Sequence, residues 1–204
     1  MSIFINNATQ VTNQQPLCDD WMTNPIWHEQ VHTRFNQPDF KQFISPANAR
    51  RMGKLLKCAL SSAISCEKEA GSPTLDGILT GTGLGCIGST EIFLNALLED
   101  GEEGLSPTSF MLSTHNTISS QIAIALKCHN YNITYSHRGI SFDSALFDAV
   151  LKFQLGQFSN AMVIGADEMT EAYFQMFEKT SKWKKKMMNP QDLFNSGTKG
   201  TIAG

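Results

Sequence analysis

The sequence predicts an α/β fold in which helices cover a largely parallel sheet. Short strand-like runs alternate with longer stretches whose apolar residues recur at helical spacing, an order typical of βαβ units. The run Ala161–Ile164 is continuously apolar and ends at Gly165, the pattern of a strand buried on both faces. With 204 residues and 41% hydrophobic content, the chain can bury a sizeable core, and one domain over residues 1–204 is expected.

The N-terminal part of the chain predicts a strand followed by a helix. Apolar residues stand among polar ones over Ser2–Val11, which favours a first strand. Ser45 and Pro46 provide an N-cap and a first helical residue, so a helix is expected to follow and to end near Gly71. Its apolar positions recur at helical spacing: Met52, Leu55, Leu56, Ala59, Leu60, Ala63 and Ile64.

The stretch Gly77–Gly85 predicts a strand that runs into a glycine-rich loop, after which Ser89 caps a helix through Glu99. Three glycines match the GxGxxG pattern of dinucleotide-binding loops: Gly83, Gly85 and Gly88. The next expected strand, Ser109–Leu112, is not followed by an acidic residue that could bind a ribose, so nucleotide binding is disfavoured. We interpret the glycines as positions of close backbone packing.

The next segments predict a helix over Ser120–Lys127 and a strand over Tyr131–Tyr135. A sharp turn at Gly139 leads into a second helix, which ends at Gly156. The apolar stripe of this second helix has helical spacing: Phe142, Ala145, Leu146, Ala149, Val150 and Phe153. A helix N-terminus at the carboxyl end of a strand is a common place for nucleophiles and anion sites.

Charge and composition exclude several classes of function. A net charge of −3 and a pI near 5.9 argue against nucleic acid as a partner. A signal peptide and a membrane-spanning run are not recognised in the sequence, so a cytoplasmic location and no membrane partner are expected. The five cysteines lack CxxC spacing, and neither a metal nor a cofactor is predicted. Lysines around Trp183 predict a solvated face or a docking patch for an acidic partner.

The order and spacing of five segments resemble the N-terminal half of a β-ketoacyl synthase. The segments are Arg50–Ile64, Gly77–Phe93, Pro107–Leu126, Asn132–Leu146 and Ala161–Glu171. The resemblance implies a thiolase-like fold, namely one half of the layered α/β/α ketosynthase architecture with a mostly parallel, mixed five-stranded sheet. The stretch Gly197–Gly204 resembles the segment before the last strand of that half, so the chain is expected to stop short of this strand. The catalytic histidines and lysine of the family belong to a C-terminal half that this sequence lacks.

In this family the nucleophilic cysteine lies on the turn between the strand that matches Asn132–Ser136 and the helix that follows. A helix N-terminus stabilises a thiolate there, and a backbone N–H helps to bind the oxyanion. An alignment without gaps places Gly139 at this position. The resemblance therefore implies a family member without its nucleophile, and we expect no side chain of this chain to perform the condensation.

Several residues around the turn are candidates for a site. The stretch Gly139–Asp143 begins like the G-x-S-x-G nucleophile elbow, with Ser141 as its serine, but has Asp143 in place of the last glycine, so a capping role is favoured over catalysis. His137 and Arg138 are predicted either to fill the substrate passage or to reach solvent or a subunit neighbour and pair with Asp143. Further acyl-pocket or interface candidates are Ser136, His115 and Asn116.

These features favour a ketosynthase-like partner subunit of fatty-acid or polyketide biosynthesis, similar to chain-length factors of polyketide or aryl-polyene-type pathways. The expected partners are acyl carrier protein and an active ketosynthase subunit, or a second copy of the chain. One alternative is an acyl-thioester hydrolase that uses Ser141, activated by His137 or His115. Another alternative is a non-catalytic module that binds acyl chains or the carrier protein.

Overall fold

The computed structural model describes residues 2–17, 23–26, 35–71 and 74–179. Two compact units divide the chain: Met1–Thr9 with Pro38–Glu168, and Gln10–Gln37 with Met169–Gly204. The first unit contains the sheet and the candidate site. The predicted lysine patch around Trp183, the segment Gly197–Gly204 and Cys18 lie outside the described residues.

Three parallel strands form the sheet of the first unit in the order β2-β1-β3. They are β1 (Gly77–Gly81), β2 (Tyr131–Tyr135) and β3 (Ala161–Gly165). The central strand β1 is buried along its whole length, whereas β3 is only partly buried. The predicted layered α/β architecture is confirmed, and the described residues supply three of the five strands expected. The pattern that we assigned to β3, burial on both faces, belongs instead to β1.

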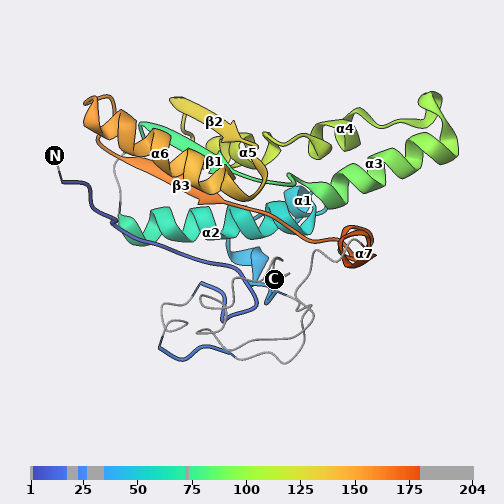
Figure 1. Cartoon of the computed structure of the whole chain (residues 1–204), viewed down its shortest axis with the longest axis horizontal. Helices are drawn as coiled ribbons and strands as arrows, with labels where there is room; N and C mark the ends of the chain where they lie inside the picture. The colour runs from blue at the N-terminus through green and yellow to red at the C-terminus, as the bar shows by residue number, and fades with distance from the viewer. Residues whose placement is uncertain (1, 18–22, 27–34, 72–73, 180–204) are drawn as a thin grey trace. The chain divides into compact units, whose positions relative to one another are not determined.

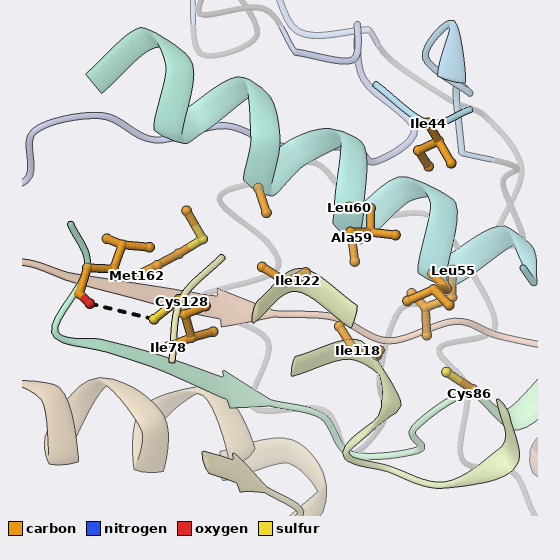
Figure 2. Packing of buried hydrophobic residues seen from close by; sticks show 13 residues of the cluster. Ile44, Leu55, Ala59, Leu60, Ile78, Cys86, Ile118, Ile122, Cys128 and Met162 are labelled. Carbon is orange, nitrogen blue, oxygen red and sulfur yellow. Dashed lines mark hydrogen bonds between the residues drawn. The ribbon is translucent and has the colours of Figure 1, made fainter. Parts of the chain in front are cut away.

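Helices cover both faces of this sheet, and the alternation of side chains along β1 divides the core between them (Figure 1). Ile78 faces a cluster formed with α2 (Lys54–Ala70) and α5 (Thr117–Ala125). Leu79 faces α6 (Ser141–Gln154) on the other side. Figure 2 shows the larger cluster, in which residues of α2 and α5 such as Leu60 and Ile122 meet beside β1.

The predicted first helix is two helices in the structure. Asp39 caps the short η2 (Phe40–Gln42). Ser45 then accepts a hydrogen bond from the backbone of Asn48 and caps α1 (Pro46–Ala49), as expected. A break at Gly53 separates α1 from α2, whose buried face carries the predicted apolar residues from Leu55 to Ala63, whereas Met52 lies before the helix. Gly71 ends α2 in the left-handed conformation with φ of 55°. The buried residues of α2 are Leu55, Leu56, Cys58, Ala59, Leu60, Ser61, Ala63 and Ser65.

The predicted strand over Ser2–Val11 is wrong, because this segment has no strand partner among the described residues. Its first apolar side chains are exposed, with Phe4 at 81% and Ile5 at 86%, whereas Val11 is half-buried. Polar side chains attach the segment to α2 instead. The Thr9 hydroxyl donates to the carbonyl of Ser62 at 3.0 Å, and Asn7 donates to Glu69 at 3.0 Å.

The predicted strand Ser109–Leu112 is also wrong, because these residues belong to the helix α4 (Pro107–Ser113). Ser106 and Pro107 start this helix as N-cap and first residue, and the apolar run that suggested a strand is too short to decide between the two structures. The preceding elements are α3 (Ile87–Asp100) and η3 (Glu102–Gly104). Helix α3 begins two residues before Ser89, which was predicted as its cap. Helix α5 begins three residues before Ser120, the predicted first residue of that helix.

In the second unit the described residues include one helix, α7 (Glu171–Lys179), in which the rings of Tyr173 and Phe177 lie 4.6 Å apart. In the N-terminal part of this unit, the backbone N–H of Asn36 donates to the carbonyl of Thr12 at 2.7 Å. Among the described residues of both units, every helix is too short or too polar to cross a membrane.

Candidate functional site

A tight turn joins the end of β2 to the start of α6. We call residues His137–Ser141 the elbow; they include the 3-10 turn η4 (Arg138–Ile140). Arg138 has φ of 54°, in the left-handed region that non-glycine residues seldom adopt. Such a residue costs on the order of 1 kcal/mol and persists because its surroundings hold it. The elbow is therefore a constrained junction at a helix N-terminus, as predicted.

The hydroxyl group of Ser141 closes the elbow as both an acceptor and a donor of hydrogen bonds. Its Oγ accepts the backbone N–H of His137 at 2.8 Å and donates to the carbonyl of Arg138 at 2.6 Å. The residue is only 2% exposed. A hydroxyl that is buried and engaged in this way stabilises the turn. Ser141 is the first residue of α6 and its N-cap is Ile140, so the hydroxyl bonds lie within the elbow and do not cap the helix.

Gly139 stands at the exposed tip of the elbow, and nothing about its conformation requires a glycine. Its φ lies outside the left-handed region, and an added Cβ would meet nothing within 4 Å. A larger side chain could therefore stand at this position without strain. The absence of a nucleophilic side chain is a property of the sequence and is not imposed by the fold.

His137 and Arg138 are exposed in this chain, as are Ser136 and Asp143. The His137 ring packs 5.9 Å from the ring of Tyr135, and its Nδ1 lies 3.0 Å from the hydroxyl of Ser144. The histidine is thus held against the outer surface of α6.

The loop after β1 carries a carboxylate contact that the sequence analysis missed. In this glycine loop, Thr82–Gly85, the backbone N–H groups of Gly83 and Leu84 donate to Asp167 at 2.9 and 2.8 Å. The Thr82 hydroxyl donates to the same carboxylate at 3.0 Å. The dinucleotide interpretation is disfavoured further, because N–H groups that would bind a phosphate are occupied by the chain's own aspartate. The sequence signal for this contact is the acidic pair Asp167 and Glu168, one residue after the end of β3.

The glycine loop contacts both groups of predicted site residues. A Cβ on Gly83 would lie 2.9 Å from the carbonyl oxygen of Arg138, and a Cβ on Gly85 would lie 3.0 Å from the ring of His115. The glycines therefore permit close packing, as interpreted from the sequence. The elbow lies against Gly83 and His115 lies against Gly85, so both pack on the glycine loop. Asn116, which follows His115, is exposed and is the N-cap of α5.

The neighbouring carboxylate, Glu168, accepts the backbone N–H of Gly88 at 2.9 Å. Burial raises its pKa, and the charge of Glu91 adds to this shift. Burial, followed by the charge of Glu168, raises the pKa of Cys58 to about 12 and that of Cys86 to about 11. Thiols with such pKa values are protonated at neutral pH and make poor nucleophiles.

A metal centre is not formed by the described residues, where no group of three or more His, Cys, Asp or Glu side chains could hold an ion. The site instead consists of an elbow without a nucleophile, a glycine loop held by Asp167, and two exposed histidines. Such an arrangement can position a bound group or a partner, but it presents no activated nucleophile of the cysteine or serine type.

A family model, Beta-ketoacyl synthase, N-terminal domain, matches residues 19–188. The comparison with curated proteins gives no match.

Several solved structures share the fold. One is "the ishigamide ketosynthase/chain length factor", with a TM-score of 0.72 and 15% identity over 96% of this chain and 54% of that one. Another is the ketosynthase ApeO in complex with its chain length factor ApeC from Xenorhabdus doucetiae, with a TM-score of 0.66 and 17% identity over 88% of this chain and 75% of that one.

A third structure is a type II PKS acyl-carrier protein in complex with its ketosynthase bound to the hexaketide. It has a TM-score of 0.62 and 15% identity over 73% of this chain and 45% of that one. These similarities confirm the predicted thiolase-like ketosynthase fold. The chain spans about half the length of two of these three relatives.

Proposed function

The chain belongs to the β-ketoacyl synthase family through its N-terminal domain, and from this premise we propose that it is a non-condensing subunit comparable to a chain length factor. Gly139 is the observation that carries the proposal. It occupies the tip of the elbow, where an activated nucleophile would benefit from the N-terminus of α6. The residues around it offer no substitute, because Ser141 is buried and fully hydrogen-bonded.

A subunit without chemistry of its own needs a partner that supplies the reaction, and α6 offers a surface for one. We call the exposed apolar side chains on the side of α6 away from the sheet the α6 outer face; they are Leu146, Phe147 and Leu151, together with the C-cap Leu155. Monomeric proteins seldom expose several large apolar side chains together. Beside this face, β2 pairs with β1 along one edge, and its other edge has no strand among the described residues.

Polar and aromatic contacts order this side of the first unit. The Tyr131 hydroxyl donates to Asp148 at 2.9 Å, and the Lys152 ammonium lies 4.8 Å from the centre of the Tyr131 ring. Burial raises the pKa of Tyr131 to about 12, with a further contribution from Asp148. An apolar helix face beside an ordered polar strand edge is a surface suited to binding an active ketosynthase subunit. A homodimer is the alternative assembly through the same surface.

The second proposed partner is acyl carrier protein, and a cluster of cations supports it. We call these residues the basic cluster: Lys41, Arg50, Arg51, Lys54 and Lys57. They belong to η2, to the connection between α1 and α2, and to the first turn of α2, and all except the half-buried Lys57 are exposed. Such a surface attracts a partner with an acidic surface.

Reversing two charges of the basic cluster is expected to weaken binding of the carrier protein. The double variant Arg50→Glu/Arg51→Glu should lower the affinity about tenfold or more at low salt, because rim charges mainly affect association. Titration calorimetry at two ionic strengths, on the chain in complex with its ketosynthase, measures the effect. The double variant Lys68→Glu/Lys127→Glu changes the net charge equally at exposed positions outside the cluster. Equal loss in both variants would contradict a specific docking surface.

Covalent labelling tests the proposed absence of chemistry. After incubation with acyl and malonyl thioesters of acyl carrier protein, mass spectrometry is expected to find no adduct on the wild-type chain. The variant Gly139→Cys should react with iodoacetamide about tenfold faster than Cys58, because a helix N-terminus favours the thiolate whereas burial disfavours it. An acyl adduct on the wild type would contradict the proposal, and slow, unselective labelling of the variant would contradict the placement of the elbow.

The proposed place of the protein is a fatty-acid or polyketide pathway, including the aryl-polyene type. The hydrolase alternative has little support, since the Ser141 hydroxyl is buried and the His137 ring faces Ser144. A module that only binds acyl chains or the carrier protein differs from a ketosynthase partner in one measurable way. Deletion of the partner subunit lowers product formation, whereas deletion of an unpartnered module leaves the ketosynthase active.

A further inference from the structure

The contacts of Asp167 extend beyond the loop that it binds. We infer that Asp167 is a positioning residue, which holds the elbow in its strained conformation by fixing the glycine loop against it. The inference concerns the geometry of the site and does not depend on which reaction or partner the site serves.

Asp167 lies at the carboxyl end of the sheet. β1 and β3 run in parallel and end side by side, with Gly81 opposite Gly165. The backbone N–H of Ala166 donates to the Gly81 carbonyl at 3.1 Å and continues the pairing past the end of β3. Asp167 therefore emerges beside the glycine loop, although the two segments are far apart in sequence.

The carboxylate of Asp167 accepts hydrogen bonds from several donors of the glycine loop. The N–H of Gly83 lies 2.9 and 3.0 Å from the two Asp167 oxygens, and the N–H of Leu84 and the Thr82 hydroxyl complete the set. Thr82 is fully buried, and its hydroxyl oxygen also accepts the N–H of Gly85 at 2.9 Å. Hydrogen bonds to an ionised group are stronger than neutral ones, so the carboxylate fixes the loop conformation.

The glycine loop packs directly against the elbow. Gly83 packs so closely on Arg138 that an added Cβ would lie 2.9 Å from the Arg138 carbonyl oxygen. Arg138 is the elbow residue with left-handed φ, and a residue in that conformation relaxes unless neighbours confine it. Ser141 confines it from α6, and Gly83 confines it from the glycine loop. Release of the loop therefore removes one of two restraints.

Amide hydrogen exchange on the wild-type background provides the test. The N–H of His137 is bonded to Ser141 within the elbow, so its exchange rate reports elbow opening. In Asp167→Ala we expect faster exchange at Gly83 and Leu84, which lose their acceptor. We also expect exchange about tenfold faster at His137, which corresponds to roughly 1.4 kcal/mol less resistance to local opening.

The matched control is Asp76→Ala, at the opposite end of the same two strands. Asp76 accepts the backbone N–H groups of Ser159 and Asn160 at 2.6 and 3.1 Å. Its removal is expected to speed exchange at those two amides and to leave His137 unchanged. Amides of the buried core, such as that of Ile78, report any loss of global stability in either variant.

The outcomes separate positioning from general stabilisation. Faster exchange at His137 in Asp167→Ala alone, beyond any change at Ile78, supports the inference. An unchanged rate at His137, or the same acceleration in Asp76→Ala, overturns it. If Asp167→Ala does not fold, Asp167→Asn keeps one acceptor oxygen and takes its place, with a smaller effect in the same direction expected and the same two results overturning the inference.

Discussion

Replacing Gly81 with alanine is expected to lower the free energy of unfolding by about 3 kcal/mol, at the upper end of what overpacking of a core costs. A Cβ on Gly81 would lie 2.5 Å from the backbone nitrogen and Cα of Phe142. These are backbone atoms at the start of α6, and no side-chain rotation can relieve the clash. The helix would have to move away from β1, which is buried along its whole length.

Thermal unfolding measures this effect, with a decrease in Tm of about 6–12 °C expected for a chain of this size. The control is Gly139→Ala, in which the added Cβ meets nothing within 4 Å and φ lies outside the left-handed region. Its Tm should remain within about 2 °C of the wild type. Equal stability of Gly81→Ala and Gly139→Ala would mean that α6 does not pack on β1 as closely as described.

Replacing Phe147 with aspartate is expected to abolish assembly with the ketosynthase partner, with an affinity loss of about 100-fold or more. Phe147 is 71% exposed in this chain and belongs to the α6 outer face. An aromatic side chain buried at an interface contributes strongly to binding, and a carboxylate buried in its place would lack a partner. Coexpression and copurification with a candidate ketosynthase, followed by calorimetry, measure the loss.

The matched control is Phe4→Asp, because Phe4 is 81% exposed and lies outside α6. This variant should bind the ketosynthase like the wild type. Light scattering of each variant alone distinguishes the homodimer alternative, in which Phe147→Asp changes the molar mass without any partner present. Binding that survives Phe147→Asp, or that is lost equally in Phe4→Asp, would exclude the α6 outer face as the interface.

The part of the fold predicted best from sequence is the segment from β2 to β3. The strand Tyr131–Tyr135 and the following helix were expected at their observed positions, because an apolar stripe at helical spacing is a local signal. Of that stripe only Leu146 belongs to the α6 outer face, whereas Phe147, Leu151 and Leu155 lie outside the stripe. Periodicity marks a helix as amphipathic, but it does not tell which apolar residues the protein's own core covers and which remain for a partner.

The errors have a common physical cause, since strand formation depends on a partner that the local sequence does not reveal. Ser2–Val11 has apolar residues among polar ones, which suggested a strand, yet its polar side chains bind α2 and no neighbouring strand is described. The residues assigned to a strand at Ser109–Leu112 follow a serine and proline that start a helix. In that case the start signal was a better guide than the apolar run.

The candidate site was predicted in part. Its elbow, with Gly139 at the tip and Ser141 in a structural role, follows from the order of strand, turn and helix together with the family resemblance. The role of Asp167 could not be predicted, because its donors lie 83 to 85 positions earlier in the chain. An acidic residue after a strand is too common to identify such a contact without the pairing of β1 with β3.

The two aspartates at the ends of β1 and β3 also have a consequence for folding. Asp76 binds the segment before β3, and Asp167 binds the loop after β1, through hydrogen bonds between residues 83 and 84 positions apart. A slip of one residue in this pairing would displace each carboxylate by about 3.3 Å and reverse the faces of Ile78 and Leu79. In the observed alignment both carboxylates reach their backbone donors, so the two aspartates add polar specificity to a register that is otherwise set by burial of apolar side chains.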